Sequence, residues 1–233
     1  MASTAKHWID PTFLAPNVVE VDVEPVLMEG LQPFVEQIQA GPLAPGDVTL
    51  QGLRFFHRTK RKWRSDVGWI SAADERCYAL FEDLFDRMGL AEKLAPRLNC
   101  DREVRLYSGF FVTRSHCTEP DFHVDWLEGD NQGFTFLGAV SDNAGEIPMN
   151  YLTVRKEVRE YRYPPGKGVV FGDRFLHATG PGQTKLPTVL LCFNFGTDRM
   201  EDWDPLERTC ASQSRLYRRP DGVFVEHEVP TGY

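Results

Sequence analysis

The chain has 233 residues, a formal net charge of −8, 42% hydrophobic and 26% charged residues. This is an ordinary globular composition, long enough for one large domain. The acidic balance argues against a nucleic-acid partner. No apolar run reaches the length of a membrane span, and the first 16 residues lack the apolar stretch of a signal peptide. We therefore expect a single cytoplasmic domain over residues 1–233, with no membrane partner and with its five cysteines as free thiols.

Residues 1–100 are expected to form a helix-containing support region. A helix is predicted over residues 26–39, because Leu31, Phe34, Val35 and Ile38 share one face, although Pro33 interrupts it. A longer helix is predicted over residues 71–88, followed by a short helical turn over 91–98. Its apolar positions recur at helical spacing: Ala73, Cys77, Leu80, Phe81, Leu84, Phe85 and Met88. Ser71 is the expected N-cap, Asp74 completes the capping pattern, and Gly89 ends the helix.

The segment "RFFHRTKRKWR", residues 54–64, combines aromatic residues with six basic ones in an acidic chain. One interpretation is a strand at a sheet edge with solvated charged side chains, which is the commoner reason for such a pattern. The other is a surface for an anionic partner: a carboxylated or phosphorylated small molecule, or a carrier protein.

Residues 101–200 are rich in short β-type runs separated by turn residues. This regular spacing predicts a sandwich or barrel. The predicted strands cover residues 104–113, 122–127, 134–140, 151–154, 157–163, 168–171 and 188–195. In the C-terminal extension, 201–233, Pro220-Asp221-Gly222 predicts a hairpin. The predicted fold class is α+β, mainly β, with a jelly-roll core braced by N-terminal helices.

His123 and Asp125, within "DFHVDW", are two apart, so on a regular strand they would face the same side. His177 follows 54 residues later, and four strands of a jelly roll would bring it back beside them. Two imidazoles and one carboxylate form the facial triad typical of non-haem Fe(II), whereas zinc more often takes three histidines or a cysteine set. The alternative is that these are unrelated polar features. His7, His57 and His227 have no partner at useful spacing, and His116-Cys117 is expected in an ordinary surface loop, with a redox or metal role as the alternative.

These residues resemble the Fe(II)/2-oxoglutarate-dependent dioxygenases. The similarity covers residues 102–197 and rests on His123-Val124-Asp125, on "PGKGVVFGDRFLHATGPG" around His177, and on the upstream "RLYSGFF". It implies a double-stranded β-helix (cupin-like) core, with His123, Asp125 and His177 as ligands of Fe(II). It also implies 2-oxoglutarate and O₂ as co-substrates, succinate and CO₂ as products, and hydroxylation of a C–H bond as the default outcome.

The same resemblance implies a basic residue that binds the far carboxylate of 2-oxoglutarate. It usually stands eight to eleven residues after the distal histidine, where Lys185 is the basic candidate; Arg105 and Arg174 are the alternatives. Strand alternation would place Lys185 on one face with Val189, Leu191 and Phe193, and Thr188 on the other. Tyr107 is expected to face the site as a further contact of the co-substrate.

Trp126, Phe110 and Phe136 are the candidates for the wall of a substrate pocket. The length of the chain favours a small-molecule substrate, and Asp125 argues against a halogenase, which needs that coordination position for chloride. Two alternatives stay open: a hydroxylase of protein side chains, prolyl or lysyl, for which residues 54–64 would be a docking surface, and a non-catalytic cupin-like binding protein. The sequence does not predict the oligomeric state.

Overall fold

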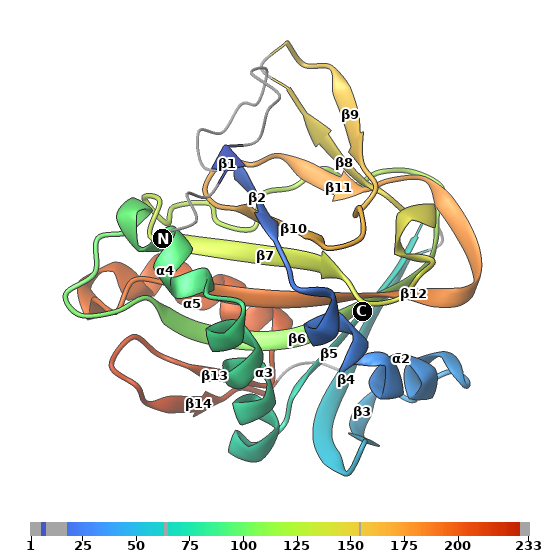
Figure 1. Cartoon of the computed structure of the whole chain (residues 1–233), viewed down its shortest axis with the longest axis horizontal. Helices are drawn as coiled ribbons and strands as arrows, with labels where there is room; N and C mark the ends of the chain where they lie inside the picture. Colours follow the sequence, from blue (N-terminus) through green and yellow to red (C-terminus); the bar gives the residue numbers. More distant parts are fainter. Residues whose placement is uncertain (1–5, 8–17, 63–64, 154, 229–233) are drawn as a thin grey trace.

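A nine-stranded antiparallel sheet forms the centre of the molecule (Figure 1). The computed structural model describes residues 6–7, 18–62, 65–153 and 155–228. In spatial order the strands are β1 (Lys6–His7), β2 (Val18–Asp22), β10 (Lys167–Phe171), β7 (Gly133–Ala139), β12 (Gly182–Gly196), β6 (Arg105–Cys117), β5 (Ser65–Ala72), β4 (Leu53–Lys62) and β3 (Gly46–Leu50). Consecutive residues of a strand point to opposite faces, so each long strand serves two different environments.

A three-stranded antiparallel sheet contributes to the packing on one face of the large sheet. Its strands, in spatial order, are β11 (His177–Thr179), β8 (Met149–Leu152) and β9 (Val158–Tyr161). Side chains of both sheets share one buried cluster, which includes Phe110, Tyr151 and Phe171. The expected double-stranded β-helix, mainly β with helical support, is confirmed by this arrangement.

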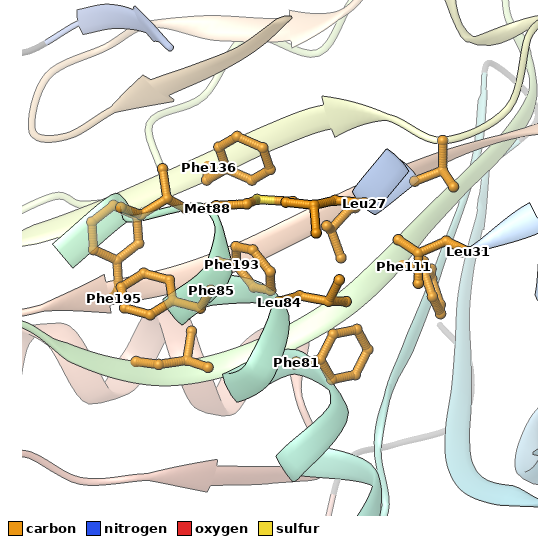
Figure 2. Packing of buried hydrophobic residues seen from close by; sticks show 14 of the residues in the cluster. Leu27, Leu31, Phe81, Leu84, Phe85, Met88, Phe111, Phe136, Phe193 and Phe195 are labelled. Carbon is orange, nitrogen blue, oxygen red and sulfur yellow. The ribbon is translucent and has the colours of Figure 1, made fainter. Parts of the chain in front are cut away.

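Four helices cover the other face: α1 (Pro25–Glu29), α2 (Gln32–Gln39), α3 (Glu75–Arg87) and α4 (Leu90–Leu94). Figure 2 shows apolar side chains of α1 and α3, such as Leu27 and Phe85, packed near Phe136 and Phe193 of the sheet. Phe193 lies 5.8 Å from Phe85, ring centroid to centroid, in an edge-on arrangement, and stacks on Phe136 at 5.5 Å. These closely packed aromatic side chains hold the large sheet against the helices.

The helix predictions are confirmed in part. The predicted helix over residues 26–39 is two helices, and Pro33 stands in the first turn of the second, where its missing N–H costs nothing. Ser71 lies on β5, so the predicted N-cap is wrong; the carboxylate of Asp74 caps α3 by accepting from the Cys77 amide at 2.8 Å. Gly89, with φ +61°, ends α3 as expected.

Residues 46–72 form β3, β4 and β5, which continue the large sheet beyond β6. Among the described residues, β3 pairs with β4 only as far as His57, so the second half of β4 pairs with β5 alone. At the other end of the chain, the expected hairpin is present as β13 (Leu216–Arg218) and β14 (Phe224–Glu226). The helix before it, α5 (Trp203–Gln213), was not predicted.

Three short 3₁₀ helices complete the described elements: Ala95–Arg97, Ala144–Glu146 and Met200–Asp202. In the described ranges, every helix is too short or too polar to cross a membrane.

Candidate metal centre and its cavity

His123, Asp125 and His177 converge at the open end between the two sheets. The predicted strand over residues 122–127 is wrong, because His123 forms only an isolated β-bridge, to His177. Two hydrogen bonds close this bridge: His123 N–H to His177 O at 2.9 Å, and His177 N–H to His123 O at 3.0 Å. The Asp125 Oδ1 atom lies 3.7 Å from His123 Nε2 and 3.9 Å from His177 Nε2. One ligand atom from each residue lies within 4.8 Å of the other two, which is close enough to share one ion.

Backbone carbonyl groups fix the orientation of both imidazole rings. The Nδ1 atom of His123 lies 2.8 Å from Asp121 O, and that of His177 lies 3.0 Å from Phe175 O. Because a carbonyl oxygen can only accept, each Nδ1 carries the hydrogen and each Nε2 keeps its lone pair toward Asp125. Such outer partners hold metal-ligating histidines in the binding tautomer. The sequence did not reveal them.

The Asp125 carboxylate is held by a short chain of hydrogen bonds. Thr135 Oγ1 on β7 lies 3.2 Å from Asp125 Oδ2, and the Trp126 indole N–H donates to the same hydroxyl at 3.0 Å. Thr209 on α5 donates to the backbone carbonyl of Asp125 at 2.6 Å. These contacts leave Oδ1 directed at the two histidines and fix the carboxylate without neutralising its charge.

Burial lowers the pKa of His177 to about 4; the Asp125 carboxylate opposes this shift and His123 adds to it. His177 is therefore neutral at neutral pH, which is the form that binds a metal. The donor set of two imidazole nitrogens and one carboxylate oxygen fits a divalent iron ion with positions left open for small ligands. The residues present thus fit the metal that the resemblance implies.

A cavity of about 280 Å³ opens directly onto these three residues. Alternate residues of β6 and β7 form its apolar wall: Phe110, Val112 and Leu137. The other lining residues are Lys60, Ser65, Val67, Trp69, Arg114, Cys117, Asp121, Thr135, Thr179, Cys192 and Gln213.

Arg114 is a buried cation in this cavity that the sequence analysis did not single out. It is 9% exposed, and its Nη1 atom lies 3.4 Å from the Tyr163 hydroxyl. Its Nε atom is buried without a hydrogen-bond partner, and no carboxylate of the described residues pairs with it. The signal was available: Arg114 follows Phe110 at even spacing on one strand, so both face the cavity. A buried guanidinium without a counter-charge is costly unless an anion completes it.

Lys185 does not lie in the triad cavity. It is exposed and lines recesses beside α2, together with Gln39 and Leu186. From Thr188 onward the predicted alternation is right, but the face that was expected at the site is the other one: Val189, Leu191 and Phe193 belong to the core beneath the helices, whereas Leu190 and Cys192 pack on the cavity side. Lys185 lies within a register shift of β12 against β6, between Gln183 and Thr188.

Among the other residues predicted to contact the co-substrate or the substrate, only Phe110 lines the cavity. Tyr107 donates its hydroxyl to Thr197 O at 2.6 Å and packs against Trp203, away from the triad cavity. Trp126 lies in the same buried cluster as Tyr107, supporting Asp125 through Thr135 rather than forming a wall.

Of the remaining candidates, Phe136 faces the helices, where it stacks on Phe193. Arg105 pairs with Glu103 at 2.8 Å, and Arg174 is exposed outside the cavity.

The two-sheet core and the His–Asp–His site together define a class: the chain has the fold of the Fe(II)/2-oxoglutarate-dependent oxygenases and carries a facial triad suited to iron. No protein-family model matches the sequence, and no curated protein matches it.

Several solved structures are similar in fold. AviO1 from Streptomyces viridochromogenes Tue57 superposes with a TM-score of 0.54, at 13% identity, over 77% of this chain and 89% of that one. The epimerase SnoN, in complex with Fe³⁺, alpha ketoglutarate and nogalamycin RO, gives 0.53 at 12% identity over 78% and 79%. A prolyl hydroxylase from Trichoplax adhaerens, in complex with a hypoxia inducible factor peptide, gives 0.50 at 12% identity over 77% and 83%. At these identities the comparison shows the fold alone.

Proposed function

We propose that the chain is an Fe(II)- and 2-oxoglutarate-dependent oxygenase that hydroxylates a C–H bond of a small-molecule substrate. One atom of O₂ enters the new hydroxyl group and the other enters succinate, while 2-oxoglutarate loses CO₂. The observation that carries the proposal is one cavity that combines three converging metal ligands with a buried, uncompensated arginine. A metal site alone would not require that arginine.

Each part of the cavity has a distinct task in this proposal. His123, Asp125 and His177 would hold the iron, which together with 2-oxoglutarate supplies the activation of O₂. Arg114 would bind the far carboxylate of 2-oxoglutarate, since a guanidinium offers a planar fork to a carboxylate, with the Tyr163 hydroxyl beside it. Phe110, Val112 and Leu137 would exclude water from the reacting groups.

The size of the cavity favours a small-molecule substrate. Its volume of about 280 Å³ is at the lower end of ordinary ligand pockets. The SnoN structure contains a nogalamycin derivative and the Trichoplax enzyme contains a peptide, so the fold serves both kinds of substrate. A hydroxylase of protein side chains is therefore the second candidate, and a non-catalytic binding protein is the third.

Succinate formation is the direct test. Anaerobically purified protein is mixed with Fe(II), 2-oxoglutarate and O₂, and succinate is followed over time. We expect slow turnover even without substrate, and none from Asp125→Ala. If wild type forms no succinate and Asp125→Ala binds Fe(II) as well as wild type does, the oxygenase proposal fails. Stimulation of turnover by peptide libraries, but not by metabolite pools, would replace the small-molecule assignment with the protein hydroxylase.

A further inference from the structure

The basic segment reaches the mouth of the triad cavity through Arg58 and Lys60. Alternation along β4 separates its residues: Arg58 and Lys60 line a recess at the cavity mouth, whereas His57 and Thr59 line a separate recess behind the sheet. Lys60 lines the triad cavity as well. Two basic residues of the segment, Arg58 and Lys60, are therefore directed at the candidate metal centre, which an ordinary solvated strand would not require.

The mouth recess is a space of about 470 Å³ that continues the triad cavity. The two share Lys60, Trp69, His123, Asp125 and Gln213. The remaining lining residues of the mouth recess are Arg58, Val124, Thr209 and Ser212. A molecule in this recess would therefore extend directly to the three metal ligands.

Arg58 holds one wall of the mouth recess in place. Its guanidinium lies 5.4 Å from the ring centroid of Trp69 and donates to the carbonyl of Ser212, near the end of α5. These contacts fix the indole ring and the helix end relative to one another. Trp69 thereby presents a preformed aromatic surface beside the triad.

Lys60 and Gln213 supply hydrogen-bond donors to the same space. Within the described ranges, Lys60 forms no ion pair, and its side chain is only partly exposed. The Gln213 carbonyl oxygen accepts from Asn194 Nδ2 at 2.7 Å. This bond leaves the Gln213 amide nitrogen, with its two hydrogens, without a protein acceptor among the described residues.

The charge of the mouth recess is opposite to that of the protein. The chain carries a net charge of −8, yet the described residues that line the recess include two cations and one acid, Asp125. Asp125 is already assigned to the metal. A cleft with one sign of charge raises the local concentration of ligands with the other sign.

We propose that the substrate carries an anionic group, a carboxylate, phosphate or sulfate, which binds Lys60 and the Gln213 amide at the mouth recess. The body of the substrate lies on Trp69 and brings a C–H bond toward the triad. This assignment rests on the proposed function and names the class of substrate for that same site.

The test measures binding of matched probes to protein that holds Mn(II) and saturating 2-oxoglutarate, so that Arg114 is already occupied. The probes are 3-phenylpropionate and phenyl phosphate, with 3-phenylpropanamide and phenol as their uncharged counterparts. Saturation-transfer NMR gives the affinities, and relaxation of the probe protons by Mn(II) shows whether they lie beside the triad. The two anions distinguish a carboxylate from a phosphate preference.

We expect the anionic probes to bind near Mn(II), and the uncharged ones to bind about 10-fold more weakly. Lys60→Met should lower the affinity for the anions about 10-fold and leave the uncharged probes unchanged, because a charge-assisted hydrogen bond is lost. Lys60→Arg should retain most of the affinity. The matched control Lys185→Met removes a lysine outside the mouth recess and should change nothing.

Three results would each overturn the inference: no anionic probe binds, charged and uncharged probes bind equally, or Lys60→Met leaves anion binding intact. The proposed function fails in a different way, through loss of metal or 2-oxoglutarate binding. In that case saturation transfer on the metal-free protein still reports whether Lys60 selects anions.

Discussion

The two faces of the large sheet are built from the same strands but serve different purposes. Toward the helices, β6, β7 and β12 present aromatic residues such as Phe111, Phe136 and Phe193, all fully buried. Toward the cavity, the same strands present the polar residues Arg114 and Thr135, 9% and 1% exposed, among apolar ones. Adjacent residues of one strand therefore have different roles, one in the core beneath the helices and one in the cavity.

This difference has an energetic meaning. Burial of an aromatic side chain stabilises the fold by removing apolar surface from water. Burial of a polar group costs free energy unless it is hydrogen-bonded. On the cavity face, Thr135 connects Trp126 to Asp125, whereas Arg114 stays partly unsatisfied. The helix face thus supplies stability, and the cavity face retains groups whose partners must come from ligands.

Two neighbouring residues on β12 should show the largest difference in stability between the helix face and the cavity face of the sheet. Phe193→Ala should lower the free energy of unfolding by about 3–5 kcal/mol, because it leaves a cavity in the aromatic layer. Cys192→Ala, one residue earlier and facing the triad cavity, should cost less than about 2 kcal/mol, since less apolar volume is removed. Urea unfolding of both variants measures the difference. Equal losses would contradict the division between the two faces.

Asp125→Ala tests the cavity face itself. We expect Fe(II) or Co(II) affinity to fall by at least about 100-fold, because metal sites of this kind depend on each ligand and its hydrogen bonds. The control Asp142→Ala removes an exposed carboxylate elsewhere and should bind metal like wild type. Metal titration followed by absorption of the Co(II) complex gives both affinities. An unchanged affinity in Asp125→Ala would remove the metal assignment.

Arg114→Met separates function from stability on the same face. We expect the affinity for 2-oxoglutarate to fall about 10- to 100-fold through loss of a charge-assisted contact, while metal affinity is retained. The free energy of unfolding should stay the same or rise, because an uncompensated buried charge is removed. Calorimetric titration and urea unfolding measure the two effects. A large loss of stability with normal 2-oxoglutarate binding would make Arg114 a structural residue.

Thr135→Val is the mildest change. It keeps the shape of the side chain but removes the hydroxyl that connects Trp126 to Asp125. We expect metal affinity to fall about 10-fold, as for other groups that orient metal ligands. Thr113→Val is the matched control, because Thr113 lies on β6 and lines the recess beside α2 rather than the triad cavity. Identical metal affinities in the two variants would show that the hydroxyl does not orient Asp125.

The sequence was most informative where spacing alone carries the information. The H-x-D pair and the distal histidine identified three residues that the structure brings together. Helical periodicity predicted α3 with its apolar face, although Asp74 rather than Ser71 caps it. These features depend on neighbours a few residues apart, or on one familiar pattern.

Features that depend on distant contacts were not predicted. Strand alternation defines two faces of β12 but not which of them meets the cavity, so the face with Val189 was expected at the site although it packs beneath the helices. Even spacing from Phe110 could have placed Arg114 on the cavity face, but its buried Nε atom without a partner is seen only in three dimensions. The bond from Thr209 to Asp125 spans 84 residues and comes from a helix that the sequence did not predict.

The most direct test of the account is an anaerobic titration of 2-oxoglutarate into the Fe(II)-loaded protein, followed by visible absorption and calorimetry. We predict saturable binding of one 2-oxoglutarate per triad in wild type and in Lys185→Met, and strongly weakened binding in Arg114→Met. Absence of binding in wild type, or loss of binding in Lys185→Met but not in Arg114→Met, would contradict the assignment of this cavity to iron and its co-substrate.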